Sequence, residues 1–203
     1  MICRLNLTCA MLGIVLAGTS LIEAHAATAV RIQNRQEAQR LPFTLVAVSA
    51  KMLTDSTFAT AEKAATNGVV SSDKKTISFS KRTVRLVVHT GPDNDMLSYR
   101  IDGLRNPTLV IPHGSTLKVL FVNTDEDMFH NIRFGVMPRS FSKSGDGLLK
   151  TSVGTAPLAH IDGTTLHGAE MVIKVPGHAG KYGYFCTVRG HAPGGMWGTI
   201  QVR

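Results

Sequence analysis

The chain has 203 residues, 22 Lys and Arg against 14 Asp and Glu, and a formal net charge of +8. This length is sufficient for one domain with a substantial apolar core. The basic balance does not indicate a nucleic-acid-binding protein, because no run of five or more basic residues occurs. It suits an anionic protein partner, or alternatively tolerance of acid, since few carboxylates leave few native ion pairs to lose at low pH.

The N-terminus has the three parts of an export signal. Arg4 is followed by the apolar run 10–17 and by the small-x-small triplet 24–26. We therefore expect residues 1–26 to be a signal peptide, cleaved after Ala26, and the mature protein to be periplasmic. The apolar run is much shorter than the roughly 20 residues of a membrane-spanning helix, so no stable membrane insertion is expected after cleavage. An uncleaved anchor is the alternative.

Cleavage would change the cysteine count. Cys3 and Cys9 would leave with the signal, and the mature chain would keep only Cys186. A single thiol cannot form an internal disulfide, and in an oxidising compartment it is exposed to damage without structural benefit. Metal coordination would explain its presence.

Residues 27–75 are predicted to form an N-terminal extension with short helices. Within residues 44–53, apolar residues recur at helical spacing, which predicts a first helix, and a second is expected within residues 58–65, closed by Asn67 and Gly68.

Residues 76–203 are predicted to be a separate domain built from short strands. Apolar alternation and turn residues place them at 76–80, 84–89, 108–111, 117–122, 130–134, 171–175, 181–185 and 198–202. Many short strands with Gly and Pro turns indicate an all-β, antiparallel sandwich or barrel. Residues 138–168, rich in Gly, Ser, Thr and Pro, are expected to form a long irregular loop.

The segment 186–196 carries the chemistry. It places Cys186, His191 and Met196 five residues apart in a Gly-rich loop between two predicted strands, and His130 begins another strand. A thiolate, two imidazoles and a weak axial thioether are the ligand set of a mononuclear blue-copper site. We expect one copper ion, cycling between Cu²⁺ and Cu⁺, bound by these four residues. Four filled positions leave none for a substrate, so an enzyme is not expected.

Further residues are predicted to support this site. Apolar bulk around the ligands is expected from Phe129, Phe185 and Trp197, together with Met128. Asn131 is expected to tether the first histidine's loop to the cysteine loop. A flat surface for docking a redox partner is expected from Pro193, Gly194 and Gly195. The acidic run 125–127 is interpreted as a solvated turn, with a hard-cation site as the alternative.

The pattern resembles the cupredoxins, and among them the rusticyanin-like type 1 blue copper proteins. The resemblance covers roughly residues 51–203 and is strongest at 106–112, 117–124 and 179–198. It implies a Greek-key β-sandwich, one type 1 copper ion, and electron exchange with c-type cytochromes. Asn131 stands where the rusticyanin-like proteins carry a small hydroxyl residue, which implies a lower redox potential than theirs.

The predicted function is a periplasmic one-electron carrier that exchanges electrons with a c-type cytochrome or a terminal oxidase. The alternative is a periplasmic copper chaperone or buffer that supplies an oxidase. Such proteins more often use clusters of exposed Met and His residues, whereas the eight Met of this chain are scattered.

Overall fold

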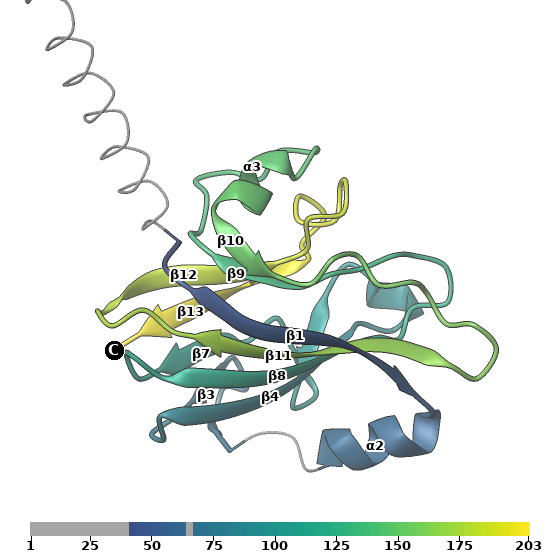
Figure 1. Cartoon of the computed structure of the whole chain (residues 1–203), viewed down its shortest axis with the longest axis horizontal. Helices are drawn as coiled ribbons and strands as arrows, with labels where there is room; N and C mark the ends of the chain where they lie inside the picture. The colour runs from purple at the N-terminus through teal and green to yellow at the C-terminus, as the bar shows by residue number, and fades with distance from the viewer. Residues whose placement is uncertain (1–40, 64–66) are drawn as a thin grey trace, which may run out of the picture. The chain divides into compact units, whose positions relative to one another are not determined.

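The computed structural model describes residues 41–63 and 67–203, so the predicted signal peptide and residues 27–40 lie outside the described part. Two β-sheets make up the fold (Figure 1). The first sheet pairs, in order, β1 (Thr44–Leu53), β11 (Leu166–Lys174), β8 (Thr116–Asn123), β4 (Thr83–Thr90), β5 (Tyr99–Ile101) and β6 (Leu104–Arg105). The second sheet pairs β10 (Ser152–Gly154), β9 (Arg133–Gly135), β12 (Gly180–Phe185), β13 (Trp197–Val202), β7 (Thr108–Ile111), β3 (Thr76–Ser78) and β2 (Val69–Val70). The all-β sandwich predicted from the sequence is confirmed, but its sheets are mixed and not antiparallel throughout, because β4 pairs with β8, and β7 with β13 and β3, in parallel.

The helical content of the described residues is small. It consists of α2 (Asp55–Lys63), α3 (Asp146–Lys150) and one 3-10 turn (Asp93–Asp95). Among the described residues, none of these helices has the length and apolarity needed to cross a bilayer.

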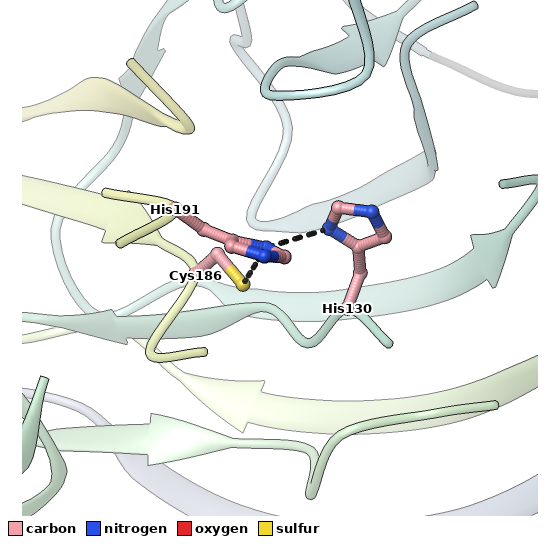
Figure 2. A group of neighbouring side chains, drawn as sticks. All are labelled: His130, Cys186 and His191. Carbon is pink, nitrogen blue, oxygen red and sulfur yellow. Dashed lines mark hydrogen bonds between the residues drawn. The ribbon is translucent and has the colours of Figure 1, made fainter. Parts of the chain in front are cut away.

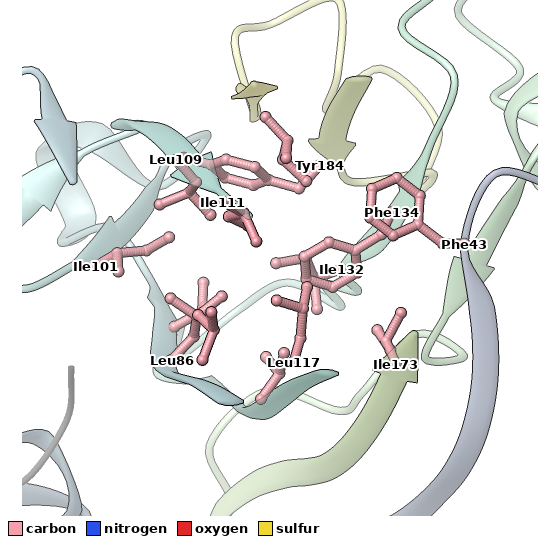
Figure 3. Packing of buried hydrophobic residues seen from close by; sticks show 14 of the residues in the cluster. Phe43, Leu86, Ile101, Leu109, Ile111, Leu117, Ile132, Phe134, Ile173 and Tyr184 are labelled. Atoms are coloured by element: carbon pink, nitrogen blue, oxygen red, sulfur yellow. The ribbon is translucent and has the colours of Figure 1, made fainter. Parts of the chain in front are cut away.

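Alternating apolar residues build the core between the two sheets. In β4 and β8, alternate side chains are fully buried in this core: Val84, Leu86, Val88, Leu117, Val119 and Phe121. Of the residues between them, Arg85 and Lys118 are exposed, whereas Val87 is buried. Aromatic rings from the other sheet, those of Tyr184 and Phe134, pack into the same core cluster as Leu117 (Figure 3). Burial of each such side chain contributes about 1.5–3 kcal/mol.

The helix predicted over residues 44–53 is wrong, because this segment is strand β1. It pairs along its whole length with β11, from Thr44 opposite Lys174 to Leu53 opposite Leu166, with one irregularity after Leu45. The apolar residues whose spacing indicated a helix do not share a buried face: Val48 is 51 % exposed and Met52 is 71 % exposed. A short isolated helix is marginal in water, whereas the open edge of β11 offers a row of backbone partners.

Of the remaining predictions for the N-terminal part and the long loop, some agree with the structure and others do not. The second predicted helix overlaps α2, although residues 64–66 lie outside the described part. Strands β1 and β2 both fall in the predicted extension of residues 27–75, yet each is hydrogen-bonded into one of the two sheets. The predicted loop 138–168 contains α3, β10 and the start of β11, none of which its composition indicated.

Candidate metal centre

Two loops at one end of the sandwich carry the predicted ligands. His130 lies between β8 and β9 and is held by two backbone hydrogen bonds with Leu158. Cys186 directly follows β12, and its backbone N–H donates to the carbonyl of Met196 over 3.1 Å. Met196 in turn donates its N–H to the carbonyl of His191 over 3.0 Å, which folds the second loop back on itself.

The four predicted ligand side chains meet in the interior. His191 Nδ1 lies 3.6 Å from Cys186 Sγ and 3.1 Å from His130 Nδ1, and His130 Nδ1 lies 3.0 Å from Met196 Sδ. Figure 2 shows His191 reaching toward both Cys186 and His130. All four are buried; His191 is the most accessible, with 8 % of its surface exposed.

This set of donor atoms fits a metal ion of soft or borderline character. The donor atoms of His130, Cys186 and His191 all lie within 4.8 Å of one another, as required for three ligands of one ion. Two imidazole nitrogens, one thiol and one thioether select copper in preference to hard cations, which prefer oxygen. The three residues are thus positioned as a metal site.

Asp125 holds the far side of the first imidazole. His130 Nε2 lies 3.0 Å from Asp125 Oδ2, and the carboxylate is only 4 % exposed. A carboxylate accepts hydrogen bonds, so the imidazole carries its proton on Nε2 and presents the bare Nδ1 to the site.

The interpretation of residues 125–127 as a solvated turn is therefore wrong for Asp125, although Glu126 and Asp127 are exposed. The signal available in the sequence is the turn chemistry of Asp, which accepts N–H bonds from residues two and three positions later. Here the backbone N–H groups of Asp127 and Met128 both donate to Asp125 Oδ1 over 2.8 Å.

Burial and neighbouring charges set the protonation states of the metal-free site. Burial raises the pKa of the Cys186 thiol to about 11, against the opposing hydrogen bonds from the backbone N–H of Asn131 and Val188 and from Tyr99. Burial, with the charge of His130, lowers the pKa of His191 to about 4. The thiol is therefore protonated, and His191 neutral, at neutral pH.

The pKa values of the Asp125–His130 pair both lie below their ordinary values. Burial lowers the pKa of His130, although the hydrogen bond and charge of Asp125 act in the opposite direction. Burial would raise the pKa of Asp125, but the two backbone N–H groups and His130 outweigh it. Asp125 is thus a carboxylate beside a neutral imidazole.

Asn131 connects the two ligand loops. Its Nδ2 donates to Thr187 Oγ1, and its Oδ1 accepts from the Thr187 backbone N–H, both over 2.8 Å. The side chain is 1 % exposed. These bonds lie directly between the residue after the first histidine and the residue after the cysteine.

The three aromatic residues predicted around the site have different environments. Phe185 is fully buried, and its ring lies 6.0 Å from that of Phe141. Trp197 is 38 % exposed and packs against Phe141 at 5.5 Å, while Phe129 is 51 % exposed and meets the ring of His160. Phe185 thus contributes to the dry interior, and the other two form part of the surface.

Tyr99 was missed by the sequence reasoning. It is fully buried in β5, its hydroxyl donates to the carbonyl of Asn131 over 2.5 Å, and the same hydroxyl acts to lower the pKa of the Cys186 thiol. Its ring packs against those of Phe121 and Tyr184 at 6.0 and 5.6 Å. A three-residue strand carries too little alternation to be detected from the sequence.

The predicted docking residues follow His191 in the same loop. Pro193 and Gly194 are exposed, and Gly195 is half-buried. Gly195 has φ 113°, a conformation that favours glycine, and its carbonyl accepts a hydrogen bond from Asn106 over 2.9 Å. The loop is therefore fixed in place.

Comparison with known proteins supports the assignment of a copper site. Residues 68–203 match the family model of the sulfocyanin (SoxE) domain. Rusticyanin of Acidithiobacillus ferrooxidans is 31 % identical over 136 residues, which cover 63 % of this chain and 81 % of that protein. Rusticyanin of Acidithiobacillus ferridurans is 30 % identical over 137 residues, 67 % of this chain and 71 % of the relative.

Solved structures show the same fold. A structure of reduced rusticyanin superimposes with a TM-score of 0.64 at 25 % identity and covers 76 % of this chain and all of that one. Rusticyanin from Thiobacillus ferrooxidans gives a TM-score of 0.64 at 26 % identity and covers 76 % of this chain and 97 % of its own.

Proposed function

Since this chain belongs to the sulfocyanin family of rusticyanin-like blue copper proteins, we propose that it is a periplasmic one-electron carrier whose copper is held by His130, Cys186, His191 and Met196. The observation that carries the proposal is the convergence of these four donors in the interior, with separations of 3.0–3.6 Å between neighbouring donor atoms. Bound copper supplies a one-electron couple, Cu²⁺/Cu⁺.

The protein's own residues keep the ligands in one arrangement. The Cys186 sulfur accepts hydrogen bonds from the backbone N–H groups of Asn131 and Val188, which moderates its negative charge once it is a thiolate. Asn131 and Thr187 lock the two loops together. A site whose ligands are already held in place needs little movement when the charge of the metal changes, and electron exchange is then fast.

His191 is the route by which electrons enter and leave. It is the most accessible of the four donors, and the exposed Pro193 and Gly194 follow it in the chain. A small, flat surface there allows a partner to approach the imidazole edge closely. We assign this surface, with Gly195, to docking of a redox protein.

The partner is a c-type cytochrome or a terminal oxidase. The chain's charge of +8 favours a partner with an anionic docking face. Export through the signal at residues 1–26 would place this chain in the periplasm, where it could meet such a partner. Four protein donors leave no position for a substrate, so this is a carrier and not an enzyme.

The test is the visible spectrum of the copper-loaded mature protein. An intense thiolate-to-copper band that bleaches with ascorbate and returns on reoxidation is expected. Cys186→Ser should abolish this band, and His113→Gln, which alters an exposed histidine away from the site, should leave it unchanged. A weak d–d band, or copper removed by a mild chelator, would instead identify a chaperone or buffer.

A further inference from the structure

The Asp125 carboxylate uses both of its oxygens as acceptors. Oδ1 accepts from the backbone N–H groups of Asp127 and Met128, and Oδ2 accepts from His130 Nε2. The backbone of Asp125 is fixed as well, because its N–H donates to Asn123 Oδ1 over 3.2 Å and its carbonyl accepts from Ile161 over 2.9 Å. The carboxylate therefore cannot turn away from the imidazole without breaking several bonds.

Only a carboxylate satisfies this arrangement. An amide at position 125 has one acceptor and one donor group. If its oxygen faced the N–H groups of Asp127 and Met128, its NH₂ would face the Nε2–H of His130, donor against donor. If the amide were reversed, its NH₂ would oppose the two backbone donors. Relief would require moving the His130 proton to Nδ1, the atom that faces Cys186, His191 and Met196.

We propose that Asp125 is a positioning residue that fixes His130 as an Nδ1 donor and, through its buried negative charge, lowers the midpoint potential of the copper couple. The proposal rests on the proposed function. A carboxylate hydrogen-bonded to a ligating imidazole makes that imidazole a stronger donor. A nearby negative charge in a poorly solvated site also favours the more highly charged ion, Cu²⁺.

The experiment compares two neighbouring substitutions in the copper-loaded mature protein. Asp125→Asn removes the charge and the second acceptor. Asp127→Asn removes the same charge from an exposed side chain in the same turn, and leaves its backbone N–H bond to Asp125 in place. Midpoint potentials and the electron paramagnetic resonance spectra of the oxidised forms are measured for both.

We expect Asp125→Asn to weaken Cu²⁺ binding by about 10- to 100-fold. If the affinity for Cu⁺ falls less than the affinity for Cu²⁺, the midpoint potential rises by about 59 mV for each tenfold change in the ratio of the two affinities. The copper hyperfine pattern should change as well, and Asp127→Asn should alter neither. An unchanged potential in Asp125→Asn, or an equal rise in Asp127→Asn, would overturn the proposal.

A second measurement needs no variant and holds even if Asp125→Asn does not fold. In the Cu⁺ form of the wild-type protein, nitrogen-15 NMR should show His130 protonated at Nε2, with that proton protected from exchange. A rapidly exchanging or absent Nε2 proton would refute the positioning role. Failure of the proposed function is recognised separately, because the wild-type protein would then lack the intense copper band.

Discussion

Asn131→Ala tests whether one amide holds the two ligand loops together. The substitution removes both 2.8 Å hydrogen bonds to Thr187 and leaves the Thr187 backbone N–H without its partner. An unsatisfied buried donor costs about 1–3 kcal/mol, and loss of the bond to the hydroxyl adds about 1 kcal/mol. Because Thr187 is half-buried and its hydroxyl can rebond to water, we expect a total loss of about 2–3 kcal/mol in the free energy of unfolding.

The assay is urea unfolding of the metal-free protein, in which the midpoint should fall while the slope stays constant. Asn67→Ala is the matched control, because the Asn67 side chain also makes two hydrogen bonds, in this case to the backbone of Thr83 and Arg85 on strand β4. It should lower stability and leave the copper spectrum unchanged, whereas Asn131→Ala should alter both. A wild-type unfolding midpoint in Asn131→Ala, or an unaltered copper spectrum, would refute the reasoning.

The other predictions follow from burial and packing. The pKa of His191 falls from 6.5 to about 4 on folding, so the unfolded chain binds more protons than the folded one between these pH values. The free energy of unfolding of the metal-free protein should therefore fall by up to ~3 kcal/mol as the pH is lowered from 6.5 to 4. In His191→Gln, the urea midpoint should lack this dependence on pH. Because the pKa of Cys186 is about 11, copper uptake at pH 8 should release about one proton per ion, measured by calorimetry in buffers of different ionisation enthalpy; no release would contradict a thiolate ligand. Gly198→Ala would place its Cβ 2.1 Å from the ring of Tyr184 and should destabilise by about 1–3 kcal/mol in thermal unfolding, whereas Gly177→Ala, with no atom within 4 Å, should not.

The strands that the sequence predicts are those with a buried alternating face. Strand β7 was predicted with its observed bounds, and β4, β8, β12 and β13 to within one residue at each end. Strand β1 could not be recognised, because its order comes from backbone pairing with β11, 113–130 residues away in sequence, and most of its side chains are exposed. Non-local pairing leaves no periodic signal in the segment itself.

The residues of the site also differ in how far they could be predicted from the sequence. Cys186, His191 and Met196 could be assigned from one loop, because their residue types and spacing have few other uses. His130 required the assumption that its turn lies at the same end of the sandwich, and the structure brings its Nδ1 to 3.1 Å from that of His191. Asp125 and Tyr99 act through the tertiary fold, which buries a turn carboxylate and an isolated tyrosine beside the ligands.

The full burial of Cys186 also determines what can happen to a newly folded molecule before it receives its metal. A neutral sulfhydryl group with no accessible surface is a poor nucleophile and a poor target for peroxide or for another protein's disulfide. The empty protein can therefore persist without forming mixed disulfides or sulfenic acid. Copper binding would displace the proton from this sulfur, and His191, with 8 % of its surface exposed, is the most accessible of the four donors.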